Sequence, residues 1–175
     1  GNEEVEVIRG VVLDNPTPFT MGEMAPGSIV GPLAHNLLWR GGNMGGESAM
    51  LLHCRNELLL EGSSSGSGRS GIKPIGSSGI YEGGLQQAMD SCNEGTSENG
   101  DYKFFFNYCE FSRTELDKIL SEIDEDDGDA WISVEVPPAI ILNDLWNKNQ
   151  CWSFLRKIIK KRLAKAEEEE ESFSP

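Results

Sequence analysis

The sequence predicts an α/β (α+β) fold, with a mixed, largely antiparallel twisted sheet, flanking helices and a C-terminal helix. Residues 102–111 are the densest aromatic stretch in a chain with 8% aromatic residues, and they are typical of a buried strand. Ser112 and Glu115 follow with the S-x-x-E spacing of a capping box, and apolar residues then recur at helical spacing up to Ile123. A strand, a tight turn and an amphipathic helix therefore form the centre of the predicted domain.

Short apolar runs predict three strands in the first third of the chain. They cover residues 5–13, 37–40 and 49–54. We expect a turn at 14–18, because this stretch contains two prolines and an Asn-Pro pair.

The Gly- and Ser-rich residues 61–79 are interpreted as a flexible surface insertion. Within them, residues 66–71 match G-x-G-x-x-G literally. That motif binds a dinucleotide where it opens a helix after a strand, and the residues that follow it here, Ile72-Lys73-Pro74, do not begin a helix. We therefore interpret the motif as part of the insertion, and we expect the next helix at 85–92.

The C-terminal third begins with the acidic residues 124–129, followed by an alternating stretch at 131–136 that predicts a half-buried strand. A basic amphipathic helix is expected over 143–165, before an acidic tail. We therefore divide the chain into an α/β domain at 1–142 and a helical extension at 143–175.

The C-terminal helix is the main candidate contact surface. It combines an apolar stripe with a cationic face, and the candidate contact residues are Trp152, Arg156, Lys157, Lys160, Lys161 and Arg162. Such a helix could lie on an anionic membrane, dock in a protein groove, or cover its own domain with its charges in solvent. The sequence leaves these alternatives open.

The sequence gives little support for a catalytic site or a metal site. The net charge of -14 argues against nucleic-acid binding, which needs Lys and Arg to neutralise phosphates. The four cysteines and two histidines lack zinc-ligand spacing, and 124–129 lacks the EF-hand glutamate. His53 and Cys109 have no neighbouring nucleophile or base in sequence, so we interpret both as structural. We predict no catalytic residues, no metal and no cofactor.

Four stretches in order resemble the AlgH/YqgE-like family, small α/β proteins of bacteria and of plant and algal plastids. Residues 10–17 resemble its G-V-V-L-N-R-P-T, and residues 41–44, with the later Leu52-His53, resemble its G-G-P-V and L-H. Residues 79–84 resemble the G-L-Y-x-G-G of plant-type members. Residues 102–120 resemble F-R-F-F-x-G-Y-A-G-W-x-x-x-Q-L-x-x-E-I.

The departures from these motifs imply that the family's shared groove is altered. Asp14-Asn15 replaces Asn-Arg, Asn43 replaces proline, and Asn107 and Glu110 replace glycines. The resemblance places a possible groove at Asp14, Asn15, Gly41, Gly42, His53 and Tyr108. It also implies an N-terminal strand pair before Val5, so we expect the chain to be processed or incomplete.

Three functional hypotheses follow. The first is a non-catalytic subunit of a larger plastid or photosynthetic membrane assembly, on the stromal side, with protein partners and possible peripheral membrane contact. The second is small-ligand binding or regulation in the groove. The third is metal-dependent hydrolysis on the acidic residues. The altered groove, the absent catalytic constellation and the C-terminal helix with its apolar stripe and cationic face favour the first.

Overall fold

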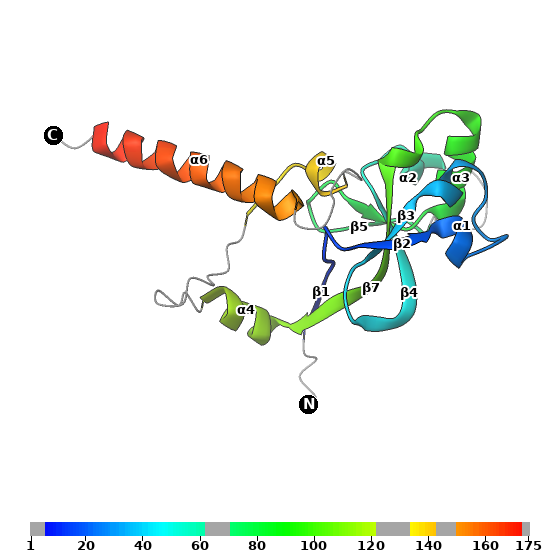
Figure 1. The fold of residues 1–175 in the computed structure, drawn as a ribbon, viewed down its shortest axis with the longest axis horizontal. Helices are drawn as coiled ribbons and strands as arrows, with labels where there is room; N and C mark the ends of the chain where they lie inside the picture. Colours follow the sequence, from blue (N-terminus) through cyan, green and yellow to red (C-terminus); the bar gives the residue numbers. More distant parts are fainter. Residues whose placement is uncertain (1–5, 62–70, 122–133, 143–149, 173–175) are drawn as a thin grey trace.

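The sheet is organised around β7 (Tyr102–Ser112), the long aromatic strand. The computed structural model describes residues 6–61, 71–121, 134–142 and 150–172. In that part of the chain the strand order is β2-β3-β7-β4-β6-β5, and β1 pairs with β7 off this path (Figure 1). The strands around β7 are β1 (Val7–Gly10), β2 (Pro16–Thr20), β3 (Leu37–Arg40), β4 (Met44–His53), β5 (Lys73–Pro74) and β6 (Tyr81–Glu82).

The described pairings confirm a mixed, largely antiparallel sheet. β3 runs parallel to β7, whereas β1 and β4 pair with β7 antiparallel. The outer pairs β2–β3, β4–β6 and β5–β6 are also antiparallel. The pairing partner of β7 changes near Asn107. Phe104–Phe106 pair with β3, whereas the last four residues of β7 pair with β1.

Helices cover both faces of the sheet. The described helices and 3-10 turns are α1 (Met21–Met24), η1 (Gly31–His35), α2 (Leu58–Glu61), α3 (Leu85–Glu94), η2 (Asn99–Asp101), α4 (Arg113–Ser121), α5 (Pro138–Ile141) and α6 (Gln150–Ser172). α3 and η1 pack over one face, and α5 lies on the other. α6 begins beside α5 and runs away from the sheet, so its C-terminal half extends beyond the domain (Figure 1).

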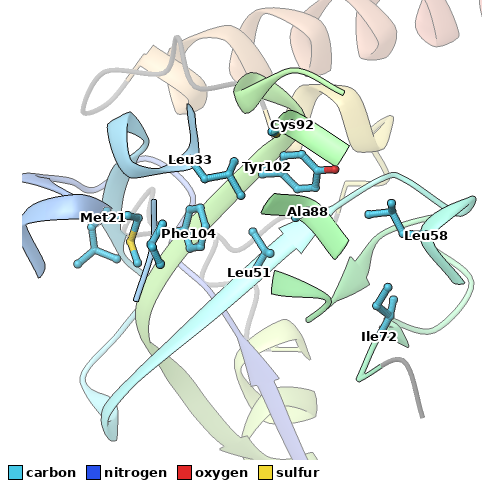
Figure 2. Close-up of a cluster of buried hydrophobic side chains, with 11 residues drawn as sticks. Met21, Leu33, Leu51, Leu58, Ile72, Ala88, Cys92, Tyr102 and Phe104 are labelled. Atoms are coloured by element: carbon cyan, nitrogen blue, oxygen red, sulfur yellow. The ribbon is translucent and has the colours of Figure 1, made fainter. Parts of the chain in front are cut away.

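The alternation of side chains along β7 supplies both cores. Tyr102 and Phe104 point into the first core, together with Leu33, Leu51 and Ala88 (Figure 2). The alternate side chains, Lys103 and Phe105, point to the opposite face, where Phe105 packs with the second core of Trp39, Leu52, Ile80 and Leu142. Each large apolar side chain buried in this way contributes about 1.5–3 kcal/mol.

Several predicted elements are confirmed. β3 matches the strand expected at 37–40, and α3 contains the helix expected at 85–92. The capping box at the start of α4 is also present. The Ser112 N–H donates to Glu115 Oε2 at 2.8 Å, and the Glu115 N–H donates to Ser112 Oγ at 3.2 Å.

The turn predicted at 14–18 was only partly right: the structure has a turn at residues 13–14, but β2 begins at Pro16 and contains both prolines. β2 pairs on one side only, so a proline without an N–H is tolerated there. The first strand is also shorter than predicted, ending at Gly10.

Several predicted segments fall partly or wholly outside the described residues, and 143–149 of the predicted tail helix are among them. Of the insertion at 61–79, residues 62–70 lie outside, whereas Ile72 is buried and Lys73–Pro74 forms β5, so this end is part of the domain. The acidic residues 124–129 lie outside. So do the first three residues of the strand predicted at 131–136, and the last three, Val134–Val136, are not in a strand. The tail helix is confirmed from Gln150 onward, and it continues beyond 165 to Ser172.

Candidate functional site

The two glycines of the predicted groove pack directly on the bend of β7. The Gly41 N–H donates to the Phe106 carbonyl at 2.8 Å, and the Gly41 carbonyl accepts from the Val12 N–H at 2.8 Å. A Cβ atom on Gly42 would overlap with the carbonyl of Tyr108 and the nitrogen of Cys109. Asn107 bends the strand here with a φ of 60°. The glycines therefore permit close backbone approach, and β7 backbone fills the space in front of them.

Asp14 and Asn15 lie beside the same end of β3. The Asn15 carbonyl accepts from the Arg40 N–H at 2.8 Å, which fixes the segment before β2. Burial raises the pKa of the Cys151 thiol, the negative charge of Asp14 raises it further, and the charge of Lys103 opposes both. These three side chains therefore influence one another where α6 begins.

Lys103 is a fully buried lysine on the second face of the sheet. Its Nζ donates to the Leu13 carbonyl at 3.1 Å and lies 3.8 Å from the centre of the Trp39 ring. A second ring, that of Phe105, has its centre 5.6 Å away. A buried ammonium needs such partners, because desolvation of an uncompensated charge costs several kcal/mol.

The predicted groove residues do not all come together. Tyr108 lies beside the glycines, with the Arg9 guanidinium 4.7 Å from its ring centre. His53 pairs with Tyr102 in the sheet register, whereas Tyr108 pairs with Met44. The six-residue separation along β7 puts His53 about 20 Å from Tyr108. His53 therefore belongs to a different part of the domain.

His53 is enclosed between two tyrosines. Its ring stacks on Tyr81 and tilts against Tyr102, with centroid distances of 5.8 Å in both cases. The Nδ1 atom accepts from the Arg55 N–H at 3.1 Å. Burial lowers the pKa of His53, and the carbonyl of Gly83 and the charge of Glu57 oppose that shift. A neutral, buried imidazole with an assigned acceptor role is consistent with a structural histidine.

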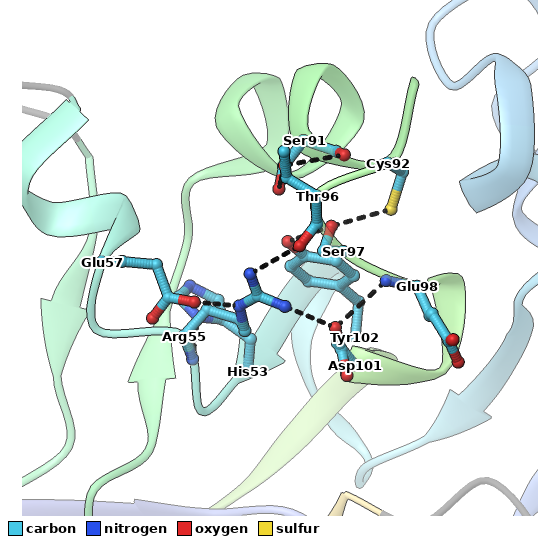
Figure 3. Close-up of polar contacts among 10 residues, drawn as sticks. All are labelled: His53, Arg55, Glu57, Ser91, Cys92, Thr96, Ser97, Glu98, Asp101 and Tyr102. Carbon is cyan, nitrogen blue, oxygen red and sulfur yellow. Dashed lines mark hydrogen bonds and ion pairs between the residues drawn. The ribbon is translucent and has the colours of Figure 1, made fainter. Parts of the chain in front are cut away.

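Arg55 fastens the end of β4 to the segment that follows α3 (Figure 3). Its guanidinium donates to Asp101 at 2.8 Å and to the Thr96 carbonyl at 2.9 Å, and it also pairs with Glu57. Sequence reasoning missed this residue, because two of its partners, Thr96 and Asp101, lie more than 40 positions away in the chain.

Hydroxyl groups continue the same cluster under α3 (Figure 3). The Tyr102 hydroxyl donates to Ser97 Oγ at 3.0 Å, and Cys92 Sγ lies 3.3 Å from the same oxygen. Ser91 and Thr96 share a further hydrogen bond of 2.7 Å. These groups form hydrogen bonds with one another, and Arg55 connects them to the end of β4. We call this cluster, with Arg55, the polar clamp.

A separate shallow groove lies beside α5. Its volume is about 620 Å³, and its lining residues are Ile75, Ser77, Ser78, Glu135, Val136, Pro137, Pro138, Ile141 and Arg162. Arg162 of the predicted contact set thus faces the domain, while the mixed polar and apolar lining carries no catalytic arrangement.

Metal ligands and membrane spans were searched for in the described part of the chain. No group of three or more His, Cys, Asp or Glu side chains is placed there to hold a metal ion. None of the described helices has the length and hydropathy needed to cross a bilayer.

The outer surface of α6 carries most of the predicted contact residues. Trp152 is 47% exposed and Phe154 is 40% exposed, one turn or less from the buried Cys151. The Arg156 guanidinium lies 6.0 Å from the centre of the Trp152 ring. The cations Arg156, Lys157, Lys160 and Lys161 are exposed, so the first turn anchors the helix while these cations face solvent; Arg162 is also exposed but borders the groove beside α5.

Comparison with known proteins decides the family. A family model described as AlgH-like (DUF179) matches residues 2–162 of this chain. The chain belongs to the AlgH-like family. The fold of this member is similar to the solution structure of the AlgH protein from Pseudomonas aeruginosa, with a TM-score of 0.52 and 19% identity. That match covers 91% of this chain and 70% of the other chain. A search of curated proteins found no match.

Proposed function

We propose that this AlgH-like chain is a non-catalytic interaction protein, a peripheral subunit of a larger membrane-associated assembly, attached through α6. The carrying observation is the exposed surface of α6, where Trp152 and Phe154 adjoin a run of cations. Large exposed aromatic side chains next to arginines are enriched at protein contact surfaces. Gly41 and Gly42 pack directly on the backbone of β7, and the polar groups around Arg55 bond to one another. Both observations support a structural role for the domain.

The plastid setting of the proposal rests on sequence resemblance. Residues 79–84 resemble the motif of plant-type members of the family. The corresponding assembly would lie in a chloroplast, at the stromal side of a photosynthetic membrane.

Purification of the tagged protein from its own cells in mild detergent tests this proposal. We expect the wild type to carry a defined set of proteins in fixed ratios, measured by quantitative mass spectrometry. The double variant Lys157→Glu with Lys161→Glu should lose them. Lys73→Glu with Lys118→Glu makes the same charge change on β5 and α4 and should retain them. Recovery of the wild type alone would contradict the proposal.

Small-ligand binding is a second candidate, favoured by the groove beside α5. Its Ser77 and Arg162 side chains offer hydrogen-bond donors next to apolar Ile75 and Ile141, whereas the Ser78 hydroxyl already donates to the Ile75 carbonyl. A thermal-shift screen of small carboxylates and phosphates, repeated on Arg162→Ala, tests it. Stabilisation of the wild type that is lost in Arg162→Ala supports this function, and no stabilisation by any compound refutes it.

A further inference from the structure

The cations on the outer side of α6 form two stripes along the helix, and each stripe begins at an aromatic residue. One stripe runs through Trp152, Arg156 and Lys160 at steps of four residues. Residues at such spacing lie above one another on a helix. All three side chains are exposed.

The second stripe runs through Phe154, Lys157, Lys161 and Lys165, at steps of three, four and four residues. These side chains are exposed as well. The helix face between the stripes and the domain holds Cys151, which is buried, and Arg162, which lines the groove beside α5. The two stripes therefore lie on the part of the helix that the domain leaves open.

The charge of this surface is opposite to that of the chain. Residues 150–165 contain six cations and no acidic residue, in a chain with a net charge of -14. The segment is about 24 Å long, roughly three times the Debye length at physiological ionic strength. The glutamates at 167–171 follow directly on the same helix, so the stretch that can meet an anionic surface is the one from Arg156 to Lys161, between the domain and these glutamates.

We propose that this surface of α6 lies on an anionic lipid bilayer, with its cations facing the lipid and with Trp152 and Phe154, which point to roughly opposite sides of the helix, at the level of the headgroups. Aromatic rings prefer that depth, and lysines along the same helix attract anionic lipids. A row of cations at helical spacing can interact with many anionic lipid headgroups at once. This inference rests on the proposed function and names the surface that α6 contacts within it.

Vesicle flotation with the purified full-length protein tests the inference without any partner protein. The probes are phosphatidylcholine vesicles with and without about one-third phosphatidylglycerol. We expect binding to the anionic vesicles only, with release at high salt because the attraction is screened. Lys157→Glu with Lys161→Glu should bind at least about 30-fold more weakly, and Lys73→Glu with Lys118→Glu should bind within about threefold of the wild type.

Trp152→Ser with Phe154→Ser provides an independent variant and should also weaken binding, at unchanged charge. No binding to anionic vesicles, equal binding to neutral vesicles, or equal loss in both charge variants would overturn the lipid assignment. If the protein still co-purified with partners in that case, a protein surface would be the contact of α6, and the proposed function would stand. Lipid binding without co-purifying partners would refute the subunit role alone.

Discussion

The Nζ atom of Lys103 lies 3.8 Å from the centre of the Trp39 ring, inside the second face of the sheet. Lys103 also donates to the Leu13 carbonyl, so it fastens the segment between β1 and β2 to the central strand. This segment carries Asp14 and Asn15, two of the positions at which the chain departs from the family motif. The buried lysine thus sets the position of the residues around the predicted groove.

Lys103→Met should lower the free energy of unfolding by about 1–3 kcal/mol. The variant loses a desolvated cation–π contact worth about 2 kcal/mol and leaves the Leu13 carbonyl without this donor, while it avoids the cost of burying a charge. Denaturant unfolding measures the change. Lys73→Met, at an exposed position in β5, should change stability by less than about 0.5 kcal/mol. A Lys103→Met protein as stable as the wild type would show that the cost of burial outweighs these contacts.

Gly42→Ala should destabilise the domain by about 3 kcal/mol or more. The added Cβ overlaps with the backbone of Tyr108 and Cys109, which cannot move as a flexible side chain can. Gly10→Ala is the matched control, because a Cβ there meets nothing within 4 Å. Thermal unfolding of both variants distinguishes them. Equal melting temperatures of Gly42→Ala and Gly10→Ala would mean that Gly42 does not pack against the β7 backbone in solution.

Arg55→Met should cost about 2–3 kcal/mol, because the Thr96 carbonyl loses the Arg55 donor and Asp101 keeps only the Glu98 N–H. Arg113→Met removes an exposed pair with Asp117 four residues along α4 and should cost about 0.5 kcal/mol or less. Urea unfolding measures both changes. A similar small loss in the two variants would contradict the clamp assigned to Arg55.

His53 should make stability depend on pH. Burial lowers its pKa in the folded state, so the unfolded state binds the proton more tightly. Its contribution is fully present above the unfolded-state pKa of about 6.5 and is lost as the pH falls through the lower folded-state value. His53→Asn keeps an acceptor near Nδ1 and should flatten this part of the profile. An unaltered profile in His53→Asn would contradict the assignment.

The centre of the fold was predictable because its signals are local. The aromatic run of β7 and the Ser112–Glu115 capping box lie within a few residues of one another and specify a strand, a turn and a helix. The prolines of β2 misled the prediction, since only the strand order shows that β2 is at an edge. A proline in a strand has a different meaning at an edge and in the centre.

The arrangement of the site residues depended on long-range register. The sequence motifs grouped His53 with Tyr108, but the β4–β7 pairing places them near opposite ends of the main sheet. The burial of Lys103 had one available signal, its position within an otherwise apolar run. A strand that is covered on both faces buries the side chains of both faces. The pattern of polar and apolar residues along β7 could not show that both of its faces are covered.

The native size of the protein, measured on a mild-detergent gradient of its own cells, tests the central claim most directly. The account predicts migration with a defined assembly much larger than the 19.2 kDa chain, and loss of that migration in Lys157→Glu with Lys161→Glu. Migration of the wild type alone, near 19.2 kDa, would contradict the account.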